Sequence, residues 1–174
     1  MKTMFRRTSK TRAFSLVELV IVVVIIGVIA AIAVPRISRG AKGAGEAALK
    51  GDLAGLRNAI DMYSAEHGGA FPGADGLEAT LISQLTGKST ATGTVGTTAG
   101  VHIYGPYLRS GFPPVPVGPN VGATGVIMSN AATLTTAIAE ATTSAGWVYN
   151  YTTGEIIVNT VATAEDGTTA YSSY

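Results

Sequence analysis

Residues 11–35 read TRAFSLVELVIVVVIIGVIAAIAVP and contain the most apolar stretch of the 174-residue chain. From Leu19 to Val34, sixteen residues follow one another without a charge. Upstream, Phe14 begins the apolar character and Glu18 is the one carboxylate that interrupts it. A helix over residues 14–34 rises about 1.5 Å per residue and is long enough to cross a hydrocarbon core of about 30 Å. The stretch therefore predicts a membrane-spanning helix.

Glu18 needs an explanation of its own. An ionised carboxylate inside the hydrocarbon core costs about 2.5–3.5 kcal/mol on insertion scales, so it usually has a partner or a function. One interpretation places Glu18 at headgroup depth, where it marks the edge of the span. The other needs a positive partner: if the chain were cut between Ala13 and Phe14, the new α-amino group would lie four residues before Glu18. The ammonium of one subunit could then neutralise Glu18 of its neighbour.

The residues FSLVEL at 14–19, followed by the apolar run and Pro35, resemble the N-terminus of type IV pilins and type II secretion pseudopilins. In that family a short basic leader is cut on the cytoplasmic side of the apolar run, and the new terminal phenylalanine is N-methylated. The resemblance implies a leader of residues 1–13, cleavage by a prepilin peptidase between Ala13 and Phe14, and N-methylation of Phe14. The family almost always has glycine before the cut, and alanine here preserves a small residue.

The resemblance also implies roles for three residues within the span. Glu18 would act in subunit assembly, and Gly27 and Pro35 occupy positions where the family tends to have helix-weakening residues. The implied partners are further copies of this chain, other pilin-like subunits, and an inner-membrane assembly platform with a cytoplasmic ATPase. The expected location is the bacterial inner membrane, with a periplasmic domain and a later place in a periplasmic or surface filament.

Charge is unevenly distributed along the chain. Residues 1–13 hold five of the twelve basic residues and no acid, and the remaining seven basic and all eleven acidic residues leave a net charge of −4 after Ala13. Only three basic residues follow the span closely, at positions 36, 39 and 42. The positive-inside rule therefore predicts a cytoplasmic N-terminus. This balance gives no indication of nucleic-acid binding. The chain has no cysteine, which excludes disulfides and cysteine-ligated zinc.

A secretory signal peptide is the alternative interpretation of the same stretch. Ala31-Ile32-Ala33 fits an A-x-A cleavage site, and a cut after Ala33 would release a soluble secreted binding domain. Against it, the apolar segment exceeds the usual 7–15 residues, and Glu18 lies inside it.

The rest of the chain predicts a modest domain. Buried-type residues recur at spacings of four and three from Leu49 to Tyr63, which is typical of an amphipathic helix with one face on a core. Within that helix, Glu46 and Lys50 stand four residues apart and are expected to support the exposed face. The expected segments are a leader (1–13), a transmembrane and assembly helix (14–35), its amphipathic continuation (36–67), a small α+β domain (68–161) and a loose polar tail (162–174).

The expected fold class is α+β and pilin-like, with a long N-terminal helix, half transmembrane and half amphipathic, packed on a small antiparallel sheet. Residues 76–87 suit a short second helix, and residues 126–128 a short strand. The alternation of Trp147, Tyr149, Ile156 and Val158 around a Thr-Thr-Gly turn predicts a hairpin over residues 146–161. Residues 131–145 are rich in alanine, which favours a helix, and in threonine, which favours a strand. Their secondary structure can therefore be either.

The sequence predicts no enzyme. Gly87-Lys88-Ser89 matches the end of a phosphate-binding loop, but Ile82 stands where that motif needs glycine. His67 and His102 are not at metal-ligand spacing. The resemblance leaves calcium binding possible, yet residues 110–138 contain no Asp or Glu for a hard cation, so no metal ligand or cofactor is assigned.

The expected function is that of a structural subunit in a pilus-like filament. The absence of cysteine and the TTGEI residues at 152–156 favour a pseudopilin of a type II protein secretion system. A surface type IV pilin for adhesion, motility or DNA uptake is the alternative.

Overall fold

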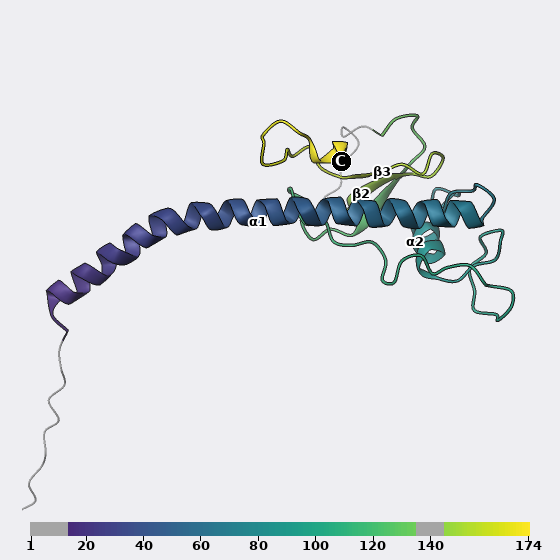
Figure 1. Cartoon of the computed structure of the whole chain (residues 1–174). Coiled ribbons are helices and arrows are strands. Elements are labelled where there is room, and N and C mark those ends of the chain that lie inside the picture. Colours follow the sequence, from purple (N-terminus) through teal and green to yellow (C-terminus); the bar gives the residue numbers. More distant parts are fainter. Residues whose placement is uncertain (1–13, 135–144) are drawn as a thin grey trace, which may run out of the picture. The chain divides into compact units, whose positions relative to one another are not determined.

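The computed structural model describes residues 14–134 and 145–174. It divides into two compact units, the first ending at Gly40 and the second beginning at Ala41. The elements in chain order are α1 (Leu16–Glu66), α2 (Glu78–Thr86), β1 (Gly125–Ser129), β2 (Ala145–Asn150), β3 (Ile156–Val158) and the 3-10 helix η2 (Tyr171–Ser173) (Figure 1).

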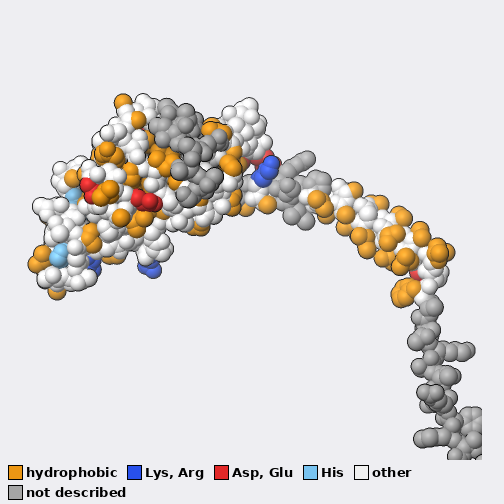
Figure 2. All heavy atoms as spheres, turned by 180° about the vertical axis from the view of Figure 1, so that it is seen from behind, with side chains coloured by type: hydrophobic (Ala, Val, Ile, Leu, Met, Phe, Trp, Pro, Cys, Tyr) orange, Lys and Arg blue, Asp and Glu red, His pale blue; other side chains and the backbone are white. Residues whose placement is uncertain are grey.

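In the first unit, α1 carries the apolar run. Its residues Leu16–Val34 are long and apolar enough to cross a membrane, and none of that stretch is buried within the protein. Figure 2 shows hydrophobic side chains covering this part of the helix on the face in view. A helix that is hydrophobic all round needs an apolar environment on every side. This stretch of α1 therefore suits an apolar environment, such as a membrane or neighbouring apolar helices.

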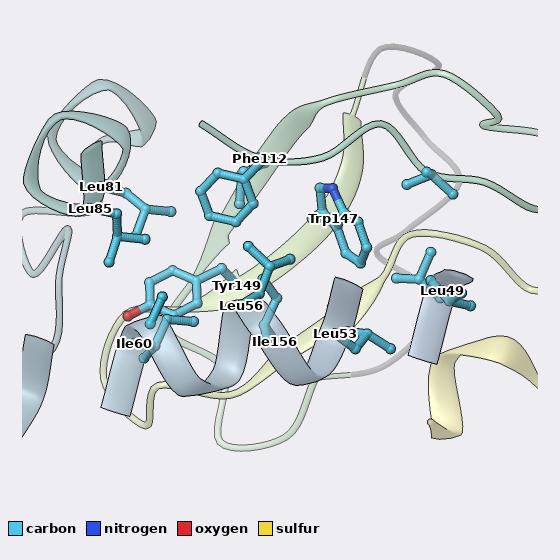
Figure 3. Packing of buried hydrophobic residues seen from close by; sticks show 14 of the residues in the cluster. Leu49, Leu53, Leu56, Ile60, Leu81, Leu85, Phe112, Trp147, Tyr149 and Ile156 are labelled. Carbon is cyan, nitrogen blue, oxygen red and sulfur yellow. The ribbon is translucent and has the colours of Figure 1, made fainter. Parts of the chain in front are cut away.

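In the second unit, α1 supplies one wall of the core. The predicted stripe is confirmed, since its members are all at most 2% exposed: Leu49, Leu53, Leu56, Ile60 and Tyr63. They pack with Trp147, Tyr149 and Ile156 of the sheet (Figure 3). Leu81 and Leu85 of α2 complete this side of the core. Spacings of three and four residues place the stripe on one helix face. The sequence pattern was therefore sufficient to predict which side of this helix is buried.

The sheet has the order β1-β2-β3, with β1 parallel to β2 and β2 antiparallel to β3. The α+β class and the predicted hairpin are confirmed, but the sheet is mixed rather than wholly antiparallel. A parallel neighbour needs a connection of about a dozen residues or more, and residues 130–144 provide that length between β1 and β2. Residues 135–144, most of the stretch in which helix and strand stayed open, lie outside the described residues.

The central strand β2 is buried along its whole length. Trp147 and Tyr149 point into the core shared with α1 and α2. Val148, between them, packs on the opposite face with Leu134 and Ile157. This alternation follows the two-residue period of a strand, so each face of the sheet has its own apolar contacts.

Both outer edges of the sheet carry a side chain from a helix. On β1, the backbone N–H of Val126 donates to Glu78 Oε1 at 2.7 Å. On β3, the carbonyl of Ile156 accepts from Arg57 Nη2 at 3.3 Å. The adjacent carbonyl, of Glu155, already faces β2, where Asn150 N donates to it; alternate carbonyls point to opposite sides, so that of Ile156 faces outward. Unpaired edge groups invite strand addition, and these contacts oppose it.

Residues 162–174 differ from the loose tail that their composition predicts. Ala164 and Tyr171 are buried, at 8% and 5% exposure, and belong to the main core. An isolated bridge pairs Thr163 with Ala170, and η2 follows directly. The polar composition conceals two anchoring aromatics, Tyr171 and Tyr174, whose rings meet edge to face at a centroid distance of 5.9 Å.

We expect Asp166 to give this segment a pH dependence. The hydroxyl of Thr169 and the backbone N–H groups of Thr169 and Thr168 donate to its carboxylate, and these bonds lower the pKa of Asp166 from 3.8 to about 2. A carboxyl with a depressed folded pKa stabilises above its unfolded value and loses that contribution as the pH falls through about 2. An NMR titration of the Thr168 and Thr169 amides should therefore show a midpoint near 2 that is absent from Asp166→Asn.

The control for this titration is Asp75, another exposed aspartate. Hydrogen bonds from Thr80 and Leu77 lower the pKa of its carboxyl. Asp166→Asn should leave the titration of amides around Asp75 unchanged. A midpoint near 4 for the Thr169 amide in the unaltered chain would show that the Asp166 hydrogen bonds are not formed in solution.

Candidate functional site

The candidate assembly site begins at the first described residue. Phe14 is 83% exposed and lies two residues before α1, which begins at Leu16. Ala13 and the proposed leader, residues 1–13, lie outside the described residues. The cleavage position therefore stays a prediction from the sequence.

Glu18 caps the N-terminus of its own helix. Ser15 is the N-cap, because its carbonyl accepts the first helical bond, from Leu19 N at 3.2 Å. The Ser15 hydroxyl accepts from Val17 N at 3.2 Å, and Ser15 N donates to Glu18 Oε2 at 2.9 Å. This reciprocal arrangement is a variant of the capping box, with the hydroxyl on the N2 rather than the N3 donor, and it satisfies two otherwise unpaired backbone donors. Ser15 and Glu18 stand three residues apart, and this Ser-x-x-Glu spacing is the sequence signal for such a cap.

The cap holds the Glu18 carboxylate at the first turn of α1. A carboxylate near a helix N-terminus is favoured by the helix dipole. Two carboxylate oxygens offer about four acceptor sites, so the bond from Ser15 N leaves room on Glu18 for an ammonium group. The geometry is compatible with both interpretations of Glu18, the edge marker and the assembly residue.

Gly27 and Pro35 both lie within α1. A side chain at Gly27 would meet nothing within 4 Å, so close packing inside this chain does not require a glycine there. Glycine costs a helix up to about 1 kcal/mol relative to alanine. Proline removes one N–H from the helical hydrogen-bond ladder. The weakening role of both residues stays a prediction.

A second candidate feature is a groove of about 230 Å³ on the second unit. Helix residues Gly51, Asp52 and Gly55 form one wall, and the loop from Leu108 to Pro113 contributes to the other. Burial raises the pKa of the half-buried Asp52 carboxyl above its ordinary value of 3.8. The groove therefore presents one carboxylate beside backbone left bare by two glycines.

The buried histidine is part of the fold. His67 Nδ1 lies 2.7 Å from the carbonyl of Tyr63, and Nε2 lies 2.9 Å from the hydroxyl of Ser89. Ser89 is fully buried, and the His67 ring stacks on Tyr63 at 3.8 Å. A Ser–His pair could supply a nucleophile and base, but this pair is sealed inside the core. Its arrangement suits packing at the end of α1 rather than catalysis.

His102, which the sequence does not assign to a metal site, makes a local hydrogen bond within its own loop. Its Nδ1 accepts from Thr98 N at 3.1 Å. Within residues 14–134 and 145–174, no three His, Asp or Glu side chains gather closely enough to hold a metal ion.

Comparison with known proteins adds one match. Residues 8–34 match the family model described as the prokaryotic N-terminal methylation motif. The match covers the capped start of α1 and the apolar run, and it does not extend into the second unit. No curated protein and no solved structure matches the chain. The chain carries a prepilin-type methylation signal on an apolar helix that leads into an α+β domain, an organisation consistent with the type IV pilin and pseudopilin family.

Proposed function

We propose that this chain is the structural subunit of a pilus-like filament. The observation that supports this proposal is the methylation motif over residues 8–34, which from Leu16 onward lies on a helix whose apolar side chains are exposed. A prepilin peptidase would cut between Ala13 and Phe14 and methylate the new Phe14 amine. The proposal assigns no enzymatic activity to the chain, as is typical of pilin-like proteins.

The exposed apolar helix supports polymerisation through this helix rather than through the domain. The second unit has its own core, and its two outer sheet edges are contacted by Glu78 and Arg57. The helix over Leu16–Val34 has no such cover. It can satisfy its apolar surface in the inner membrane first and against the same helix of neighbouring subunits after assembly.

Glu18 then has a task in the filament. Packing apolar helices together would bury the Phe14 ammonium of each subunit, and an isolated buried charge costs several kcal/mol. A neighbour's Glu18, held by its cap at the start of the helix, offsets that cost and favours one stagger between subunits. An inner-membrane platform with a cytoplasmic ATPase would drive the extraction of each subunit from the membrane.

Within this class we propose a pseudopilin of a type II protein secretion system. The lack of cysteine and the TTGEI hairpin residues 152–156 support this choice over a surface pilin. The five basic residues among positions 1–13 support an N-terminus in the cytoplasm and a domain in the periplasm.

Deleting the gene in native cells separates the two candidates. A pseudopilin predicts that folded proteins accumulate in the periplasm while surface fibres are unchanged. A surface pilin predicts the reverse, and a wild-type copy should restore either function. If neither export nor fibres changed, and no filaments containing the chain formed on overproduction, the filament proposal would be wrong.

A further inference from the structure

Three charged residues of α1 form a line along one side of the second unit. Glu46, Lys50 and Arg57 are four and seven residues apart, which places them on neighbouring positions of one helix face. Glu46 and Lys50 were expected to support the exposed face through each other. Instead, all three residues contact the segment 162–174, which is distant in sequence.

Each contact has a distinct chemistry. Glu46 Oε1 accepts from the backbone N of Glu165 at 2.5 Å and from the hydroxyl of Tyr171 at 3.2 Å. Lys50 Nζ lies 4.2 Å from the ring centroid of Tyr174, within cation–π range. Arg57 Nη1 donates to the main-chain oxygen of Tyr174 at 2.7 Å.

The segment also has an apolar anchor next to these contacts. Tyr171 and Ala164 are buried in the cluster that includes Leu49 and Leu53 of α1. The segment therefore makes polar contacts with Glu46 and Lys50 and also contributes side chains to the core that Leu49 and Leu53 line. If the segment detached from α1, it would expose part of this helix as well as its own apolar side chains.

The backbone of the segment is largely self-contained. From Ala164 onward, its backbone N–H bonds to carbonyls run within the segment: Ala164 to Thr169, Gly167 to Ala164, Tyr171 to Ala162, Ser173 to Ala170, and Tyr174 to Tyr171. The segment can leave the helix without breaking the ladder between β2 and β3. Proteins open in contiguous cooperative units, and the internal backbone bonds of this segment make it a candidate for such a unit.

We propose that residues 162–174 are a clasp that holds the first turns of the domain part of α1, and that it opens as a discrete step before the sheet unfolds. The clasp grips α1 a short distance after Gly40, where the second unit begins. In a filament subunit, the clasp determines the length of α1 that stays packed against the domain. This last step rests on the proposed function.

Hydrogen exchange by mass spectrometry on the full chain in detergent micelles tests the clasp. Glu46→Ala removes the acceptor for Glu165 N and the Tyr171 hydroxyl. Exchange should rise at least about tenfold in residues 163–174 and measurably in helix residues 43–50, because two hydrogen bonds and their burial are lost. Exchange in β2 should stay at the wild-type rate.

The matched control is Glu66→Ala. Glu66 lies on the same helix and also accepts from a tyrosine hydroxyl, that of Tyr107, which lies outside the clasp. This variant should leave exchange in residues 163–174 unchanged. Lys50→Met, which keeps an apolar stem but removes the charge over Tyr174, should give a smaller rise confined to the clasp and its helix contacts.

Three results would overturn the inference. Exchange in residues 163–174 could stay at the wild-type rate in Glu46→Ala, or it could rise while helix residues 43–50 stay unchanged. Faster exchange everywhere, β2 included, would show that the segment is not a separable unit. Because the chain is measured unassembled, none of these results depends on leader cleavage or filament formation, so failure of the clasp and failure of the proposed function are told apart.

Discussion

Replacing Trp147 by alanine is expected to lower the free energy of unfolding of the second unit by about 3–5 kcal/mol. Trp147 is fully buried at the centre of β2, between Val126 and Val158 on the flanking strands. Its indole Nε1 also donates to the carbonyl of Pro113 at 2.9 Å. The substitution removes a large side chain from the core that joins α1 to the sheet, and it leaves the Pro113 carbonyl without this donor. The total free energy of unfolding of a small domain is only about 5–15 kcal/mol.

Urea unfolding followed by far-ultraviolet circular dichroism measures this loss without relying on tryptophan fluorescence. Trp147→Phe keeps most of the apolar volume and should cost clearly less than alanine. Val161→Ala, at a site that is 48% exposed, should change stability by no more than about 0.5 kcal/mol. A loss below about 1 kcal/mol for Trp147→Ala would mean that this core does not hold the unit together.

Replacing Glu18 by glutamine is expected to reduce filament yield at least about tenfold, since leaving the neighbouring ammonium unpaired costs more than the 1.4 kcal/mol that a factor of ten represents. Glutamine still offers an oxygen to Ser15 N, so the helix cap is kept while the charge is lost. Filaments sheared from cells and quantified by immunoblot and electron microscopy measure the effect.

Ser15→Ala is the matched control, because it removes the hydroxyl that caps Val17 N and keeps the Glu18 charge. Losing such a cap costs about 1 kcal/mol of helix stability, and filaments should still form. If Glu18→Gln assembled like the unaltered chain while Glu18→Ala did not, the cap rather than the charge would be the function of this carboxylate.

Several parts of the fold could be predicted because their signal is local. The stripe from Leu49 to Tyr63 has a helical period, and the hairpin around residues 152–154 has a two-residue period on each side of a turn. Each pattern can be recognised from the spacing of its large apolar residues alone. The apolar helix is similar, since length and the lack of charge are sufficient to identify it.

Other parts depend on contacts that the sequence does not display. β1 pairs with β2 in parallel, and no local pattern within the five residues of β1 indicates which strand it joins or in which direction. Glu46 and Lys50 have the spacing of a helical ion pair, but Tyr171 and Tyr174 offer them partners more than a hundred residues away. The same two tyrosines turn a polar stretch into a packed one.

The candidate site was predicted in part. The sequence pointed to Glu18 through its place in the apolar run, and the structure adds that the carboxylate caps its own helix. This cap could have been found from Ser15 and Glu18, three residues apart. The pairing of Glu18 with a neighbour's amine involves a second subunit, so its signal is the charge of Glu18 within the apolar run and not a contact inside one chain.

The intact mass and N-terminal sequence of the protein recovered from native cells test the central claim most directly. A chain that begins at N-methylated Phe14 is the predicted result, because the methylation motif over residues 8–34 implies processing by a prepilin peptidase and the proposed cut follows Ala13. A chain that begins at Val34 would contradict the account, since it would have lost the apolar helix through which subunits are proposed to assemble. An uncut chain would contradict it as well, because Ala13 would then block the processing on which assembly depends.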